Sequence, residues 1–165
     1  MLELAQKYKE QITLAFKPHP NLYKKLLAIW GEQRTLQYYK AWEDLENAQV
    51  ERGDYVDLFK YSDAIINDSC SFVVEYLFVD RPSMFLLDRD PKPILDDLSE
   101  FGQMAFKCYD YGSSKELIEQ FIVNVINGTD KHKEERHEFR DKYLLPPNNK
   151  TACQNIIEAI LYSKI

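Results

Sequence analysis

The chain has 165 residues, which is a usual length for one domain with its own core. Its 27 acidic and 21 basic residues give a formal net charge of −6, and this excludes a broad nucleic-acid footprint, which needs clustered positive charge. A small anionic ligand stays compatible with the composition, because a few backbone N–H groups can hold a phosphate.

Cysteine usage and hydropathy indicate a cytoplasmic chain, at most peripheral to the inner face of a membrane. The three cysteines form no CxxC pair, so neither a disulfide scaffold nor a metal site is predicted. The apolar stretch near Phe72–Tyr76, which Glu75 interrupts, is far shorter than the ~20 residues that span a bilayer. Met1–Lys9 lacks the apolar core of a signal peptide.

Short apolar runs and helical patterns alternate along the first two thirds of the chain. Lys17-Pro18-His19-Pro20 ends the first strand, because prolines break regular pairing. The next breaks are Gly31, Gly53 and Arg81-Pro82. The predicted strands are Gln11–Phe16, Ala48–Glu51, Ala64–Asn67, Ser83–Leu87 and a weak Lys107–Tyr109, and the predicted helices are Leu22–Trp30, Thr35–Leu45, Tyr55–Tyr61, Phe72–Val79 and Leu95–Met104.

The last third is predicted to be helical. A capping serine and apolar positions at helical spacing mark a helix over Ser114–Ile126 that ends at Gly128. A charged helix over Lys131–Lys142 is predicted to be solvated, with His132 and His137 at its surface. Thr151 is predicted to cap a final amphipathic helix whose inward residues are Ile156, Ile157, Ile160 and Leu161.

This order of elements predicts an α/β, Rossmann-like three-layer domain over residues 1–165. We expect a mostly parallel sheet of about five strands, followed by a helical final third. Ligands of such sheets bind beyond the carboxyl ends of the strands. Two segments therefore become candidates for a site, Lys17–Pro20 after the first strand and Asp68–Glu75 after the third.

The turn Asp68-Ser69-Cys70-Ser71 lies between a buried strand and a helix. Unpaired N–H groups at a helix start, with two hydroxyls beside them, are suited to hold a phosphate. The alternative is that Ser69 or Ser71 only caps the helix, and spacing alone does not decide between the two.

Three further side chains have both a binding role and an ordinary structural explanation. Glu75 is placed to accept hydrogen bonds from the ribose of a nucleotide, or it simply favours the first turn of a helix by its charge. His19 is placed to contact a phosphate or to act as acid or base, with positive charge added by Lys17, or it is a turn residue without a ligand.

The sequence contains no GxGxxG, GxxxxGK[ST], GxSxG or HExxH motif, and no metal or cofactor is predicted.

Taken together, these segments resemble the CDP-glycerol glycerophosphotransferase family, the teichoic-acid and capsule-type polymerases and primases. The similarity covers about residues 11 to 165 and corresponds to the C-terminal, donor-binding half of a GT-B fold. It rests on Lys17–Pro20, Tyr61–Phe72, Glu75–Leu77 and Arg81-Pro82, with weaker support from Phe101-Gly102, Glu116–Ile118 and Arg140–Tyr143.

The resemblance implies transfer of a phosphopolyol from a CDP-linked donor to a cell-wall or capsule polymer. By this resemblance His19 is the catalytic residue, expected to contact the donor phosphates. The residues expected to bind the nucleotide and its phosphates are Lys17, Asp68, Ser69, Cys70, Ser71 and Glu75.

The sequence also departs from the family pattern. Asn67 replaces a threonine and Cys70 replaces a serine or tyrosine. The N-terminal half of family members, which supplies the acceptor side, is not recognised in this sequence. We therefore expect a polymer or lipid-linked acceptor to bind through that missing half. We also expect little turnover by this chain alone. Peripheral membrane contact would use the basic residues of Lys131–Arg140, but acidic residues interleave with them.

Two other functions fit the same residues. A donor domain of a capsule-type glycosyltransferase that uses a sugar nucleotide has the same phosphate turn and ribose carboxylate. A non-catalytic flavodoxin-like interaction module needs no His19 and uses the serines of the turn only as caps.

Overall fold

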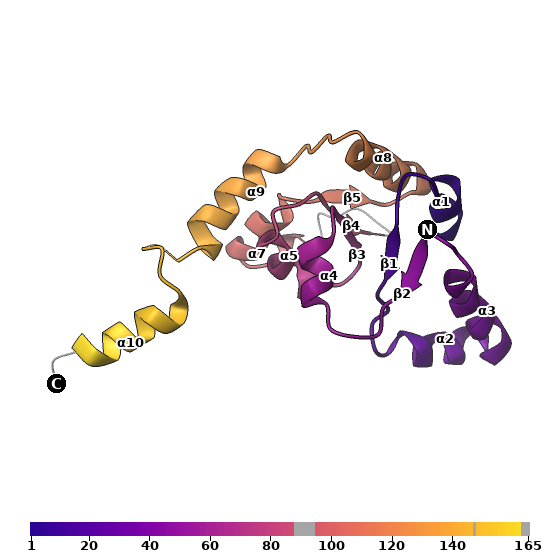
Figure 1. The fold of residues 1–165 in the computed structure, drawn as a ribbon, viewed down its shortest axis with the longest axis horizontal. Coiled ribbons are helices and arrows are strands. Elements are labelled where there is room, and N and C mark those ends of the chain that lie inside the picture. The colour runs from indigo at the N-terminus through magenta and orange to yellow at the C-terminus, as the bar shows by residue number, and fades with distance from the viewer. Residues whose placement is uncertain (88–94, 147, 163–165) are drawn as a thin grey trace. The chain divides into compact units, whose positions relative to one another are not determined.

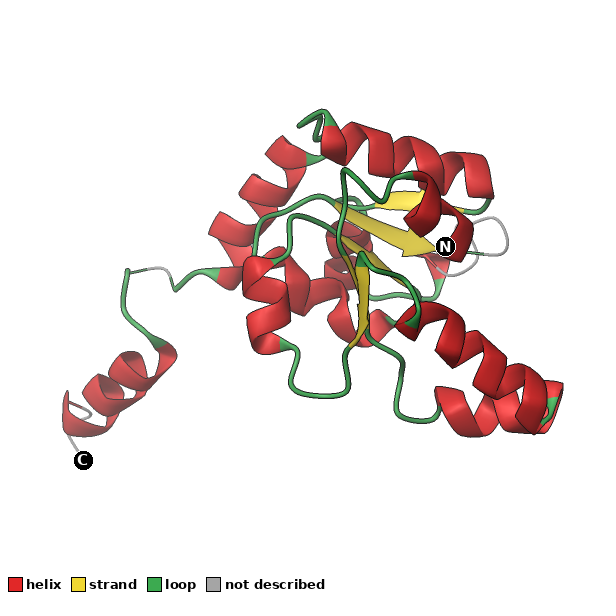
Figure 2. Ribbon diagram, turned by 45° about the vertical axis from the view of Figure 1, so that its right-hand side comes forward, coloured by secondary structure: helices red, strands yellow, loops and turns green. Residues whose placement is uncertain are grey.

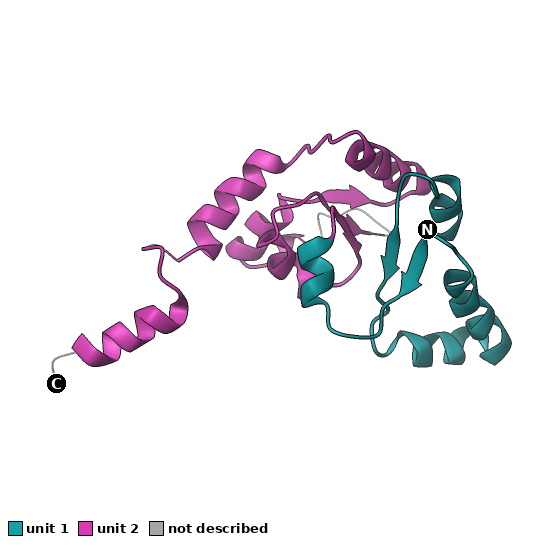
Figure 3. Cartoon of the chain, in the orientation of Figure 1, with its two compact units in different colours: residues 1–61 teal, residues 62–165 magenta. Residues whose placement is uncertain are grey.

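The computed structural model describes residues 1–87, 95–146 and 148–162 (Figure 1). The sequence also predicts a polar loop over Asp88–Pro93, and all of it lies outside the described residues. The chain divides into two compact units, residues 1–61 and residues 62–165 (Figure 3).

The fold is mixed α/β, as predicted, and all the strand pairs of the described residues are parallel (Figure 2). The strands form a two-stranded sheet, β1-β2, and a three-stranded sheet, β3-β4-β5, in place of one sheet of about five. Each strand has only three or four residues, so each pair is joined by few backbone hydrogen bonds. The strands are β1 (Leu14–Phe16), β2 (Ala48–Val50), β3 (Ile65–Asn67), β4 (Ser83–Leu86) and β5 (Asp110–Gly112).

Unit 1 contains an aromatic cluster formed by β1 and two of its helices. Phe16 of β1 stacks on Trp42 at 4.6 Å between ring centroids, and Trp42 and Tyr39 are buried. Gly31, at φ 76°, separates the helix Leu22–Trp30 from the helix Glu32–Glu43. The second of these helices therefore starts at Glu32, three residues before the predicted start at Thr35. The helices are α1 (Leu2–Lys7), α2 (Leu22–Trp30), α3 (Glu32–Glu43) and α4 (Val56–Tyr61).

Unit 2 pairs Ile65 with Ser83 and Met84 with Asp110 in parallel register. Its helical elements are η1 (Cys70–Phe72), α5 (Val73–Leu77), α7 (Glu100–Phe106), α8 (Lys115–Ile126), α9 (Lys133–Phe139), the π-helical turn η2 (Arg140–Leu144) and α10 (Ala152–Tyr162).

The last strand begins three residues later than predicted. The N–H groups of Lys107, Cys108 and Tyr109 donate to carbonyl oxygens of α7, so these residues close the helix and do not enter the sheet. Leu95 and Asp96 are helical as predicted, but the helix is interrupted after them. Helix α7 begins at Glu100, where Ser99 caps it and accepts a hydrogen bond from the Gly102 N–H at 3.2 Å.

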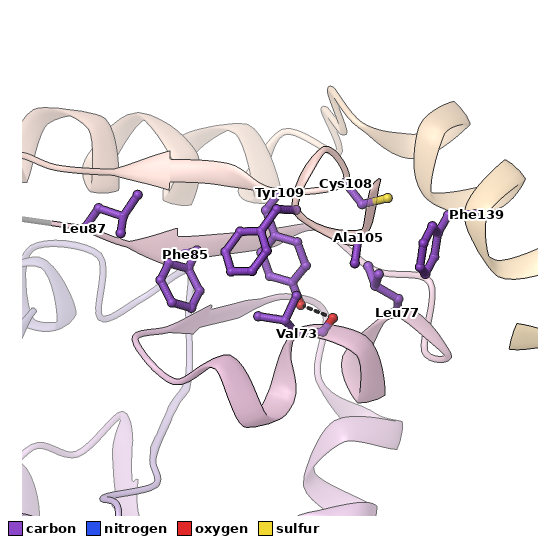
Figure 4. Packing of buried hydrophobic residues seen from close by; sticks show 9 residues of the cluster. Val73, Leu77, Phe85, Leu87, Ala105, Cys108, Tyr109 and Phe139 are labelled. Carbon is purple, nitrogen blue, oxygen red and sulfur yellow. Dashed lines mark hydrogen bonds between the residues drawn. The ribbon is translucent and has the colours of Figure 1, made fainter. Parts of the chain in front are cut away.

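The core of unit 2 lies between the sheet and the helices α5, α7 and α9 (Figure 4). The buried hydroxyl of Tyr109 donates to the carbonyl oxygen of Val73 at 2.9 Å, which ties the segment before β5 to the start of α5. The buried members of this core are Val73, Leu77, Phe85, Leu87, Ala105, Phe106, Cys108, Tyr109 and Phe139.

The charged helix near residue 136 is not uniformly solvated. Arg136 is 1% exposed, and its guanidinium pairs with Asp80 at 3.1 Å and with Asp130 at 2.5 Å. His132 and His137 both keep some exposure, but each faces an aspartate, Asp110 and Asp80 respectively. The prediction of a solvated face is wrong at Arg136, because the fold brings Asp80, distant in sequence, against its side chain. It holds for Lys133, Glu134, Glu135 and Glu138, which are exposed.

The final helix also differs from the prediction. Thr151 caps α10 as expected, since its Oγ1 accepts a hydrogen bond from the Gln154 N–H at 3.2 Å. However, Ile156, Ile157, Ile160 and Leu161 are all exposed, so none of them points into a core. A periodic apolar pattern specifies one face of a helix but not whether a surface exists in the fold to cover it.

Candidate functional site

The loop at the carboxyl end of β1 carries Lys17 and His19, as predicted. Lys17 is partly buried, and its Nζ donates to the carbonyl oxygen of Gly53 at 2.5 Å. This contact links the loop after β1 to the loop after β2, the strand that pairs with it. The ammonium group therefore lies at the carboxyl edge of the two-stranded sheet.

His19 starts a tight turn that leads into α2. The N–H of Leu22 donates to the carbonyl oxygen of His19 at 2.8 Å, which closes a four-residue turn. Asn21 has φ −88° and ψ −5°, the values of the third position of a type I turn, and Pro20 occupies the second position, which proline favours. The imidazole is exposed, and its Nδ1 accepts a hydrogen bond from the Asn21 N–H at 3.1 Å.

The second candidate segment follows β3 in unit 2. Ser69 is the cap of η1, and its Oγ accepts a hydrogen bond from the Ser71 N–H at 3.4 Å. Asp68, Cys70 and Ser71 are exposed at the same turn. Ser69 thus caps η1, and the hydroxyl of Ser71 takes no part in the cap.

Buried residues hold this turn in place. Val73, Tyr76 and Leu77 of α5 are each at most 2% exposed. The hydroxyl of Tyr76 shares a hydrogen bond with Ser62 at 2.8 Å, and burial raises the pKa of Tyr76 to about 12, against the effect of that bond. Three buried side chains in five residues fix the orientation of α5 and hence of the polar turn before it.

Glu75 lies in the first turn of α5, and it is exposed although it sits between buried neighbours. The helical geometry explains this, because Val73, Tyr76 and Leu77 fall on the inner side of the helix and Glu75 on the outer side. Its carboxylate is therefore accessible, as either of its two interpretations requires.

Asn67 is a residue that sequence reasoning treated only as a departure from a family pattern. It ends β3, directly before the polar turn, and its side chain is buried. Neither its amide nitrogen nor its amide oxygen has a hydrogen-bond partner among the described residues. Such groups are rare in folded proteins. The signal available in the sequence was an asparagine that ends an otherwise apolar strand.

The structure places the predicted residues in two groups. Asp68, Ser69, Cys70, Ser71 and Glu75 lie together on one turn and the helix after it, in unit 2. Lys17 and His19 lie together on one loop of unit 1. Within the described parts of the chain, no three His, Cys, Asp or Glu side chains gather in a metal-binding arrangement.

None of the helices in the described residues has both the length and the apolar character needed to cross a bilayer.

Comparison with known proteins identifies the family. The family model described as CDP-glycerol:poly(glycerophosphate) glycerophosphotransferase matches residues 1–162, which is nearly the whole chain. A search of curated proteins and a search of solved structures found no significant match. The chain therefore belongs to the CDP-glycerol:poly(glycerophosphate) glycerophosphotransferase family, in agreement with the resemblance of its motifs.

Proposed function

We propose that this member of the glycerophosphotransferase family serves, over residues 1–165, as a nucleotide-donor-binding domain for a CDP-linked polyol such as CDP-glycerol. The observation that carries this proposal is the match to the family over nearly the whole chain. In the reaction that the family name describes, a hydroxyl of the acceptor polymer attacks the distal phosphorus of the donor, and CMP leaves. This chain's own part is to hold the donor.

In unit 2, the turn Asp68–Ser71 is proposed to bind the donor phosphates. Two hydroxyl groups support this proposal. The hydroxyl of Ser71 is exposed. The hydroxyl of Ser69 caps η1 through its oxygen, but its proton is still available to donate. Glu75, exposed one turn further along, is proposed to accept hydrogen bonds from the ribose hydroxyls. A carboxylate suits that task because it offers only acceptors.

In unit 1, the loop after β1 is proposed to contact a phosphate of the donor. Lys17 supplies a positive charge at the carboxyl edge of its sheet, and His19 presents an exposed imidazole from a turn stiffened by Pro18 and Pro20. Both side chain types are frequent partners of phosphate oxygens.

The test is calorimetric titration of the full chain with CDP, CMP and UDP, for wild type and for Ser71→Ala. This substitution deletes one proposed phosphate contact but keeps the cap, because the cap uses the Ser69 hydroxyl and the Ser71 N–H. We expect CDP to bind, and the variant to bind it about tenfold more weakly, the effect of losing one hydrogen bond to a charged group.

Thr151→Ala is the matched control, since it deletes a capping hydroxyl at α10, outside the proposed site. Its affinity for CDP should equal that of the wild type. Absence of binding to every nucleotide would overturn the proposed function. Equal binding of CDP and UDP would instead favour a sugar-nucleotide transferase.

A further inference from the structure

The hydrogen bond between the Asn21 N–H and His19 Nδ1 determines where the imidazole carries its proton. A neutral imidazole has one nitrogen with a hydrogen and one that accepts. Because Nδ1 accepts a main-chain N–H at 3.1 Å, it cannot also carry a proton. The hydrogen of neutral His19 is therefore on Nε2, on the far side of the ring from the turn.

The turn itself maintains this arrangement. The donor is a main-chain N–H whose position follows from the type I geometry of Asn21 and from the closing bond between Leu22 and His19. Asparagine and aspartate side chains make comparable bonds to the N–H two residues ahead. His19 thus fills the place of such a residue, but it adds a second nitrogen that faces away from the backbone.

We propose that His19 acts on the donor phosphate as a neutral hydrogen-bond donor through Nε2–H, positioned by the Asn21 N–H, and not as a general base. This rests on the proposed function. Nε2 already holds a hydrogen and has no lone pair to take a proton. Nδ1 has a lone pair, but the backbone uses it, and protonation there would break the bond to Asn21.

The proton position is tested without any ligand. A long-range ¹H–¹⁵N correlation spectrum of the labelled chain at about pH 8.5, above the usual titration range of histidine, distinguishes the two tautomers. We expect His19 to show protonated Nε2 and bare Nδ1. His137 provides a contrast in the same spectrum, because its Nδ1 lies 3.0 Å from Asp80 Oδ2 and should carry the proton.

His19→Gln identifies the His19 signals by their disappearance. A spectrum in which His19 is protonated on Nδ1, or exchanges between both tautomers, would overturn the proposal.

The role of Nε2–H is tested by two variants that separate the ring nitrogens. His19→Asn keeps an acceptor near the position of Nδ1 and preserves the bond to the Asn21 N–H, but it lacks the outer donor. His19→Gln places an amide N–H near the position of Nε2. We expect His19→Asn to lose about tenfold or more in CDP affinity and His19→Gln to stay within about threefold of wild type.

The outcomes separate this proposal from the proposed function. If CDP binds and His19→Asn binds it as well as wild type does, or if His19→Gln loses as much as His19→Asn, the role of Nε2 is overturned and the proposed function stands. If the wild-type chain binds no CDP, both fail. Circular dichroism of both variants checks that the fold is unchanged, which the exposure of His19 leads us to expect.

Discussion

Arg136 is the residue whose environment differs most from its sequence context. It occurs among Lys133, Glu134 and Glu135, a stretch that predicts a solvated surface, yet its guanidinium is buried between Asp80 and Asp130. Asp80 has φ 58°, in the left-handed region, and its carboxylate also accepts a hydrogen bond from Arg140 at 2.6 Å. The ion pair with Asp80 joins α9 to the loop before β4, and the ion pair with Asp130 joins it to the loop before α9.

Replacing Arg136 by methionine should lower the free energy of unfolding by about 3–5 kcal/mol, because the partly buried carboxylates of Asp130 and Asp80 each lose an ion-pair partner, although Asp80 keeps Arg140. Chemical unfolding followed by circular dichroism measures the effect. Tryptophan fluorescence is unsuitable, since Trp30 and Trp42 both belong to unit 1. Lys133→Met, at an exposed position of the same helix, is the control and should change stability by less than about 0.5 kcal/mol. Equal effects of the two variants would contradict a structural role for the buried pair.

Asp110 should make the stability of the fold depend on pH. His132, whose Nε2 lies 3.6 Å from Asp110 Oδ1, lowers the pKa of Asp110, and Lys131 adds to this effect, while burial opposes it. A carboxyl whose pKa is lower in the folded state stabilises the fold above its unfolded pKa of about 3.9. This contribution is lost as the pH falls through the folded pKa.

Asp110→Asn should therefore be less stable than wild type near neutral pH, and the difference should shrink as the pH falls below about 5 and through the lowered pKa of Asp110. Urea unfolding at a series of pH values measures it. Asp96→Asn, at an exposed position, serves as the control and should show no such change. A difference between Asp110→Asn and wild type that stays constant with pH would argue against a lowered pKa.

Elements with local signals were predicted well. The bounds of α2 match the prediction, because Gly31 ends the helix by a backbone conformation that other residues rarely adopt. The caps at Ser114 and Thr151 each accept the expected hydrogen bond. The bounds of the strands were predicted less well. A strand of three residues shows little periodicity in its sequence. In addition, the N–H groups of a predicted strand can bind the carbonyl oxygens of a preceding helix, as those of Lys107–Tyr109 do.

Helices α8 and α10 show why an apolar pattern alone does not locate a core. Both have apolar residues at helical spacing, but Ile122 of α8 is 5% exposed and Ile160 of α10 is 70% exposed. Ile122→Ala should therefore cost about 2–5 kcal/mol in the free energy of unfolding. Ile160→Ala should cost less than about 0.5 kcal/mol. The same denaturant titration measures both, and a large loss for Ile160→Ala would show that α10 packs against the fold.

At the scale of the whole molecule, composition and order of elements predicted the class of fold but not the size of its sheets. Alternation of strands and helices favours parallel pairing, and every strand pair of the described residues is parallel. Which strands pair is not a local property, and the predicted sheet of about five strands is replaced by one of two and one of three.

The sequence by itself determined the family and the location of both candidate segments. Proline and glycine breaks, capping residues and short motifs act over a few residues, so they can be recognised without a fold. Only the tertiary structure decided that Asn67 is buried with no hydrogen-bond partner among the described residues, that Arg136 pairs with Asp80 across 56 residues, and that His19 Nδ1 is held by the backbone. These features depend on burial and on exact neighbours in space, which residue types and spacing do not encode.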